Sequence, residues 1–254
     1  MPSSAKPTHT DTGGATIAPG RTLVVLLYVA VVLTVDTLAA TRTAWPLNWG
    51  MFSWHLGNIL PATQSGFFAR FDLFKFIFWL LIPVCACLPR MDWAYLLRGP
   101  WKRPDLVFLA AIAAAGMAAM FLIPLVPALR EFYPPRSDLP LAVRLHFFAI
   151  QLVWTLSWVV GWEFLHRYAL LRAVQREPLD GGLPGWRGSQ WGWLLVPLAE
   201  TLYHLQKAWL EAAGMFALSL VLTWWCLRRR NWLLALVVHL IIEVELLLFL
   251  TFFG

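Results

Sequence analysis

Charged residues and cysteines are scarce in this sequence. Only 13% of its 254 residues are charged, whereas a soluble domain usually carries about 25%. The three cysteines, Cys85, Cys87 and Cys226, lie inside apolar stretches, and no cysteine–histidine spacing matches a zinc site. The shortage of charge excludes an ordinary water-soluble domain. The cysteines predict neither a disulfide framework nor a metal site.

Hydrophobic residues dominate instead, at 59% of the chain. A chain this apolar cannot cover its surface in water, so we expect lipid to be its solvent. The net charge of +6 is carried by short loops between apolar runs. That distribution indicates membrane topology rather than nucleic-acid binding.

Seven apolar runs are candidate membrane helices: residues 23–40, 71–88, 105–129, 141–174, 190–206, 210–227 and 231–254. About 20 apolar residues are needed to cross a bilayer as a helix. The sequence therefore predicts an all-α, polytopic transmembrane helix bundle of about seven, or eight, membrane helices. We divide it into residues 1–20, 21–140 and 141–254, and the last of these carries the polar motifs.

Two segments near the N-terminus are irregular. Residues 1–20 are rich in Ser, Thr, Pro and Gly, which is typical of a disordered tail. Residues 41–70 mix Trp45, Trp49, Phe52 and Trp54 with proline and glycine, which indicates a segment at the membrane–water interface. No clear cleavage site follows the first apolar run, so we expect a retained span rather than a signal peptide.

Basic residues alternate between the loops. The loops after the second, fourth and sixth runs are dense in Lys and Arg. Because cytoplasmic loops carry the excess of Lys and Arg, this pattern predicts a cytoplasmic N-terminus and a C-terminus outside.

Polar residues accumulate in the last four apolar runs, where lipid penalises them. A charged group at mid-bilayer costs at least ~2.5 kcal/mol on insertion scales. The residues concerned are Glu163, His166, Arg167, Glu200, His204, Lys207, Glu211, His239, Glu243 and Glu245. Several are four positions apart, so each pair shares a helical face. Polar stripes in lipid must face one another or a wet cavity, where carboxylates and imidazoles can perform acid–base chemistry.

Each stripe also has a purely structural interpretation. A glutamate–arginine pair near a helix end is often a snorkelling ion pair, and a lone intramembrane histidine often bridges helices. Lys207 and Glu211 fall near a short loop, where a solvated pair is the simpler interpretation. Three stripes on three helices are harder to explain in this way.

Three motifs resemble those of the CPBP intramembrane proteases, the group that contains the CAAX prenyl endopeptidases. The segment from Trp162 to Arg167 is similar to the Trp-Glu-Phe-x-x-Arg form of the first motif in bacterial members. Glu200 to His204 resembles the second motif, Phe-x-x-x-His, and the residues up to Glu211 resemble its extension. His239 to Glu243 resembles the third motif, His-x-x-x-Asn. The resemblance covers about residues 150–250, the CPBP-like core, and implies an inner membrane protein of a bacterium.

The resemblance implies a role for each matching residue. Glu163 would be the base that activates water, His204 would share or orient that water, and His239 would help to bind the oxyanion. Arg167 would position the carboxylate. The supporting positions are Glu243, Glu200, Lys207 and Glu211.

The sequence departs from the family pattern at three positions. Trp162 replaces the first glutamate of the first motif, which puts activity in doubt. Glu200 replaces the phenylalanine of the second motif, and we interpret it as a second acid that compensates. Glu243 replaces the asparagine of the third motif, and an ionised glutamate cannot donate to an oxyanion.

We therefore predict an intramembrane endopeptidase of the glutamate type that hydrolyses a peptide bond in a membrane-anchored protein or peptide. Its partners would be membrane lipids and this substrate, with no nucleic acid. We expect no cofactor and no metal. A His₂Glu zinc site is the alternative that we do not favour. The alternatives in function are a catalytically inactive membrane scaffold and a small proton-coupled transporter.

Overall fold

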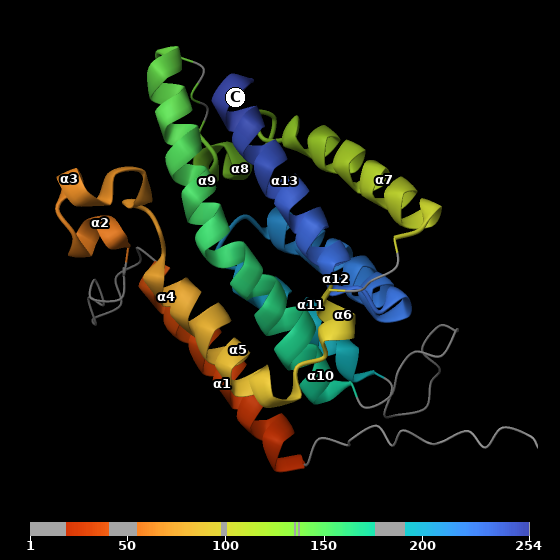
Figure 1. Ribbon diagram of the computed structural model, residues 1–254. Coiled ribbons are helices and arrows are strands. Elements are labelled where there is room, and N and C mark those ends of the chain that lie inside the picture. The colour runs from red at the N-terminus through yellow and green to blue at the C-terminus, as the bar shows by residue number, and fades with distance from the viewer. Residues whose placement is uncertain are drawn as a thin grey trace, which may run out of the picture.

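The computed structural model describes residues 19–40, 55–97, 101–134, 136, 138–175 and 191–253. Apart from one isolated bridge between His55 and Asp72, the regular structure in this part of the chain is helical (Figure 1). The predicted all-α class is confirmed. Most of the expected tail, the tryptophans at positions 45, 49 and 54, and the loop at 176–190 lie outside the described residues.

Six helical stretches in the described part are long and apolar enough to cross a membrane, so the chain is an integral membrane protein. Three are single helices: α7 (Arg103–Met120), α12 (Trp209–Arg229) and α13 (Trp232–Phe252). A fourth, Gly20–Leu38, lies within α1 (Pro19–Ala40). The other two contain a widened π-helical turn. They consist of α4 (Leu73–Lys75), η3 (Phe76–Leu81), α5 (Ile82–Cys87) and η4 (Leu88–Arg90), and of α9 (Leu141–Phe164), η5 (Leu165–Leu170) and α10 (Leu171–Val174).

The run at 190–206, which we expected to be the fifth span, forms a shorter helix. After the 3₁₀ turn η6 (Gly192–Leu194), α11 (Leu195–His204) has only 10 residues. At 1.5 Å per residue this is about 15 Å, half of the ~30 Å hydrocarbon thickness. A turn at residues 205–207 ends the helix and leads into α12. The run at 105–129 is also interrupted, because α7 ends at Met120 and the short helix α8 (Pro127–Phe132) begins at a proline.

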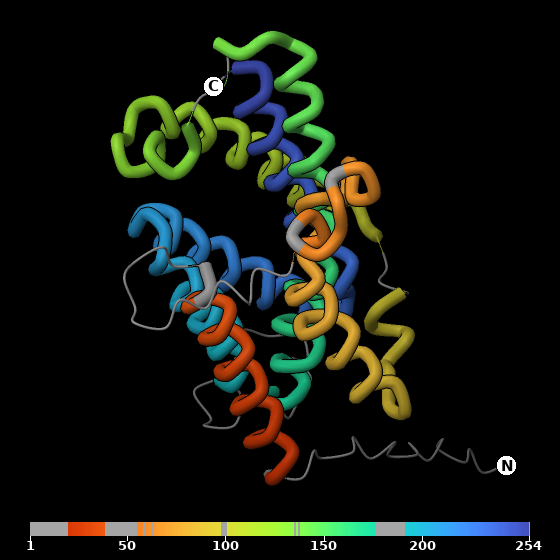
Figure 2. The backbone as a smooth tube through the Cα atoms, turned by 90° about the vertical axis from the view of Figure 1, so that its left-hand side faces the viewer, coloured from red at the N-terminus to blue at the C-terminus, as the bar shows by residue number. Residues whose placement is uncertain are grey.

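The remaining helices are short. α2 (Leu56–Ile59), α3 (Ala62–Ser65) and η2 (Gly66–Phe68) precede α4, and α6 (Trp93–Leu97) precedes α7. Figure 1 shows α2 and α3 together at one side of the bundle, above α4, and Figure 2 shows the same orange segment at mid-height.

The centre of the bundle is the long helix α9, which packs against α13 on one side and η3 on another, while α11 pairs with α12 (Figure 1). Gly161 allows the close approach of α9 and η3, because a Cβ at this position would lie 3.0 Å from the Cβ of Trp79. A cluster of buried aromatic and aliphatic side chains from α1, η3, α9 and α11 fills the space between these helices. Many large apolar side chains on the outside are exposed, as expected where lipid replaces water.

Three of the basic segments meet at one end of the bundle. The Asp92 carboxylate lies 3.0 Å from Nη1 of Arg172 and 4.0 Å from Nη2 of Arg230. Asp92 follows the second apolar run, Arg172 lies at the end of the fourth, and Arg230 follows the sixth. The first helix begins at this end and the last helix finishes at the opposite end (Figures 1 and 2).

Hydrogen bonds to Asp105 connect the start of α7 to the end of α12. Its carboxylate is fully buried and accepts hydrogen bonds from Nε1 of Trp225 at 2.9 Å and Nε of Arg229 at 2.8 Å. Asp105→Ala leaves both donors unpaired, so we expect the free energy of unfolding in detergent to fall by about 2–3 kcal/mol. The control is Asp138→Ala, which removes an exposed carboxylate. Equal stability of the two variants would contradict a structural role for Asp105.

Candidate functional site

Three helical segments bring the charged stripes together inside the bundle. The segment formed by α9 and η5 carries Glu163 and Arg167, α11 carries Glu200 and His204, and α13 carries His239. Within each of the first two segments the residues are one helical turn apart, so they face the same neighbour. The structure thus places the three sequence motifs around one centre.

Arg167 occupies this centre. Its Nη1 donates to both carboxylate oxygens of Glu163, at 2.8 and 2.7 Å. Arg167 also donates two hydrogen bonds to Glu200, from Nη1 to Oε1 at 3.0 Å and from Nη2 to Oε2 at 2.9 Å. Nη2 donates further to Oγ of Ser219 at 3.1 Å, which joins α12 to the network. Both carboxylates are fully buried and the arginine is 2% exposed.

His239 contacts this network from α13. Its Nδ1 lies 2.6 Å from Oε1 of Glu163. Because Glu163 is ionised against Arg167, its carboxylate can only accept, so the hydrogen of this bond belongs to Nδ1. The other ring nitrogen, Nε2, lies 3.8 Å from Oε1 of Glu243.

His204 is oriented in a comparable way. Its Nδ1 lies 2.7 Å from the backbone oxygen of Glu200. A carbonyl oxygen can only accept, so Nδ1 carries hydrogen and the neutral ring offers Nε2 as an acceptor. This Nε2 lies 4.0 Å from Oε1 of Glu211, a separation that one water molecule can bridge.

Lys207 and Glu211 form a pair, as their spacing predicts, with Nζ 2.6 Å from Oε1. Tyr133, which directly follows α8, joins them: its hydroxyl donates to Glu211 at 2.9 Å and accepts from Lys207 at 3.3 Å. Burial raises the pKa of Tyr133, so the phenol stays a neutral donor. The pair is therefore tied to α8 as well as being partly solvated.

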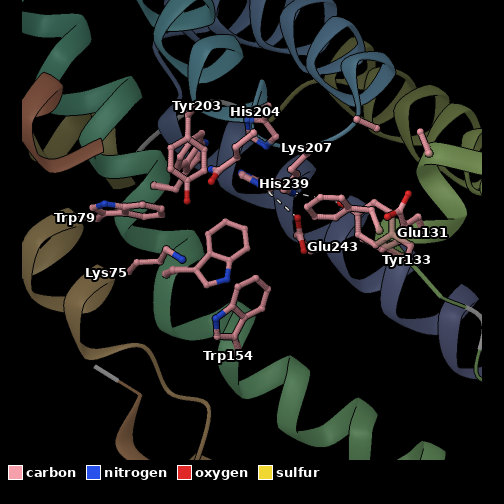
Figure 3. Close-up of a pocket in the computed structure, with 17 residues that line it drawn as sticks. Lys75, Trp79, Glu131, Tyr133, Trp154, Tyr203, His204, Lys207, His239 and Glu243 are labelled. Carbon is pink, nitrogen blue, oxygen red and sulfur yellow. Dashed lines mark hydrogen bonds and ion pairs between the residues drawn. The ribbon is translucent and has the colours of Figure 1, made fainter. Parts of the chain in front are cut away.

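A cavity of about 820 Å³ opens beside these groups (Figure 3). Of the site residues predicted from the sequence, it is lined by His204, His239, Lys207 and Glu243. The cavity lining does not include Glu163, Arg167, Glu200 or Glu211. The two imidazoles therefore stand between the buried charges and the open space.

Aromatic side chains form much of the cavity wall, including Trp79, Trp154, Trp158, Trp162 and Tyr203. The ring of Trp162 lies edge-on to both histidines, with centroids 5.6 Å from His204 and 6.5 Å from His239. It is 2% exposed. The residue that replaces the first motif glutamate thus packs against both imidazoles.

The N-terminal half contributes cavity residues that the sequence motifs did not reveal. Lys75 and Trp79 come from the second span, and Tyr133 follows α8. The Lys75 ammonium lies 3.2 Å from Asp72 and 3.7 Å from Asp36, and Tyr203 donates to Asp36. Lys75 near the start of the second apolar run and Asp36 near the end of the first were the signals in the sequence for this buried cluster.

Metal ligation was the open question from the sequence. Among the residues that the structure describes, no group of three or more His, Cys, Asp or Glu side chains is arranged to hold a metal ion. His239 and Glu243 approach each other to 3.8 Å, and His204 and Glu211 to 4.0 Å. Independence from metal stays a prediction.

Comparison with known proteins identifies one family. Residues 144–244 match the family model described as type II CAAX prenyl endopeptidase Rce1-like. The matched segment begins within α9 and ends within α13, so it contains the three motifs and the whole Arg167 network. No curated protein and no solved structure gives a significant match. The resemblance to the CPBP intramembrane proteases is thereby confirmed over residues 144–244, which we call the Rce1-like region because it is similar to the type II CAAX prenyl endopeptidase Rce1-like family.

Proposed function

We propose that this protein is an intramembrane endopeptidase that hydrolyses a peptide bond in a membrane-associated protein or peptide. The observation that carries the proposal is the placement of His204 and His239, which come from different helices and line one cavity. In each ring Nδ1 is hydrogen-bonded to an acceptor, so Nε2 is the nitrogen left to exchange a proton or a hydrogen bond with a substrate or water. A pair of oriented imidazoles that line one cavity is suited to hydrolysis.

The proposed reaction uses one water molecule and no covalent intermediate with the protein. Nε2 of His204 accepts a proton from the water, and the hydroxide oxygen forms a bond to the carbonyl carbon of the substrate. An N–H donor at His239 stabilises the oxyanion that develops. The oxyanion then reforms the carbonyl, the C–N bond breaks, and the leaving amine takes the proton from His204. The products are a carboxylic acid and an amine.

Glu163 has a different place in this scheme from the one that the family resemblance implies. The resemblance makes it the base that touches water, but its carboxylate is fully buried and is held by Arg167 and His239. We propose that it acts through His239, by fixing the ring and supporting its charged form, as the buried carboxylate of a catalytic triad does. Glu243 faces the same ring from the cavity side.

The substrate and setting follow from the surroundings of the cavity. It lies among membrane helices, and tryptophan, tyrosine and phenylalanine side chains form much of its wall, so an apolar or membrane-anchored segment is the substrate class that it suits. The cluster of basic residues around Asp92 supports a cytoplasmic location for that end of the bundle, with the N-terminus inside and the C-terminus outside. We propose the inner membrane of a bacterium.

A catalytically inactive membrane scaffold is the second candidate. The observation that favours it is Trp162, which stands where the family motif has a glutamate and whose ring packs against both histidines. The same fold and cavity would then bind a partner without cleaving it.

Loss of either histidine tests the endopeptidase proposal. We expect His204→Ala to lower cleavage by about 10²- to 10⁴-fold, because a general base is removed. We expect His239→Ala to lower it by about 10²- to 10³-fold, because an oxyanion donor is removed. The measurement is the release of fragments from membrane-anchored reporter proteins in liposomes, followed by mass spectrometry.

The matched control is His146→Ala, which removes an exposed imidazole at the start of α9. It should cleave at the wild-type rate. Cleavage retained by both site variants would reject the proposed mechanism, and a wild-type protein that cleaves no reporter while binding one would favour the scaffold.

Chelators test the prediction that no metal is required. We expect cleavage to be unchanged after incubation with 1,10-phenanthroline or EDTA and dialysis, because the proposed water activation depends on His204 alone. Loss of activity that added Zn²⁺ restores would instead support the His₂Glu zinc alternative.

A further inference from the structure

Arg167 and three buried side chains around it form a group in which the positive and negative charges do not balance. Glu163 and Glu200 are fully buried and Arg167 is 2% exposed, while His239 is 9% exposed. With both carboxylates ionised and His239 neutral, the group holds one excess negative charge. Burying an uncompensated charge is costly, and a membrane interior has little water to offset it. One added proton makes the group neutral.

We propose that Glu200 is a positioning residue whose second buried negative charge holds His239 in its doubly protonated, cationic form. This inference rests on the proposed function for its catalytic meaning, although the protonation state can be measured without a substrate. Glu200 stands where the second family motif has phenylalanine, and this proposal gives its carboxylate a role.

The hydrogen bonds decide where the added proton resides. Both carboxylates accept two bonds from the guanidinium of Arg167, so each is held in its ionised form. The ring of His239 donates from Nδ1 to Glu163 at 2.6 Å. Its Nε2 borders the cavity and faces Glu243, so a second hydrogen there has an acceptor within one water.

His166 is the other histidine in reach, and it is a poorer holder of the proton. Its Nδ1 lies 2.9 Å from the backbone oxygen of Trp162 and 3.9 Å from Oε1 of Glu200. Its Nε2 is buried with no partner among the described residues. A hydrogen on this nitrogen would have no acceptor, so the neutral ring satisfies His166 better.

The other charges near His239 favour the same state. Glu243 lies on α13 itself, and Glu211 on α12 is already paired with Lys207. The indoles of Trp158 and Trp162 also neighbour the ring, with centroids 5.5 and 6.5 Å away, and carry no charge. The cation nearest to the carboxylates is Arg167, which the count above already includes.

If His239 is charged, the two imidazoles have different roles, one as a hydrogen-bond donor and the other as an acceptor. With hydrogen on Nε2, it can donate to an oxyanion from the start of the reaction. His204, whose Nε2 carries no hydrogen when the ring is neutral, remains the acceptor for water. Glu200 contributes to both through one residue: its carboxylate supplies the charge, and its backbone oxygen orients His204.

The test is the protonation state of His239 in the full-length protein in nanodiscs, with ¹⁵N-labelled histidine and no substrate. The His239 signals are identified by their loss in His239→Gln. In the wild type at pH 7.5 we expect both ring nitrogens to be protonated. In Glu200→Gln we expect the ratio of charged to neutral ring to fall at least about tenfold, because a unit charge is removed from a low-dielectric site.

Two variants separate charge from structure. Glu200→Asp keeps the charge and should keep His239 protonated. Ser219→Ala removes another partner of Arg167 without changing the charge, so it should also leave His239 protonated.

A neutral His239 in the wild type would overturn the inference even if Glu200→Gln failed to fold. Equal protonation in the wild type and a folded Glu200→Gln would also overturn it. Absence of cleavage by a protein with charged His239 would count against the proposed function alone.

Discussion

The structure depends on one buried arginine held between two carboxylates. Arg167 makes four hydrogen bonds to Glu163 and Glu200 and a fifth to Ser219, all away from water. In such an environment a lone charge is far more costly than a paired one. Each partner is therefore needed by the others, and the helices that carry them are restricted to one relative placement. Three elements, η5, α11 and α12, are joined through this guanidinium.

The same network sets the orientation of the groups that face the cavity. Glu163 fixes the ring of His239, and the backbone of Glu200 fixes the ring of His204. The charges themselves remain behind the imidazoles, where the cavity does not reach them. A site built in this way presents oriented imidazoles to the cavity while its ions stay paired.

The cavity is not a product of the Rce1-like region alone. Residues 144–244 supply the motifs, but Lys75 and Trp79 from the second span and Tyr133 beside α8 complete the wall. The N-terminal helices, which carry none of the three motifs, therefore contribute directly to the wall of the cavity.

Composition and periodicity by themselves determined that this chain is an all-helical membrane protein, and the four-residue spacing determined which polar residues share a helix face. The three motifs in the sequence were also sufficient to recognise the family resemblance. Only the tertiary structure decided that Arg167 takes Glu200 as well as Glu163, that α11 is too short to span, and that Glu163 lies behind His239. The reason is physical: spacing defines directions within one helix, but the depth and rotation of that helix against its neighbours depend on the packing of the whole bundle.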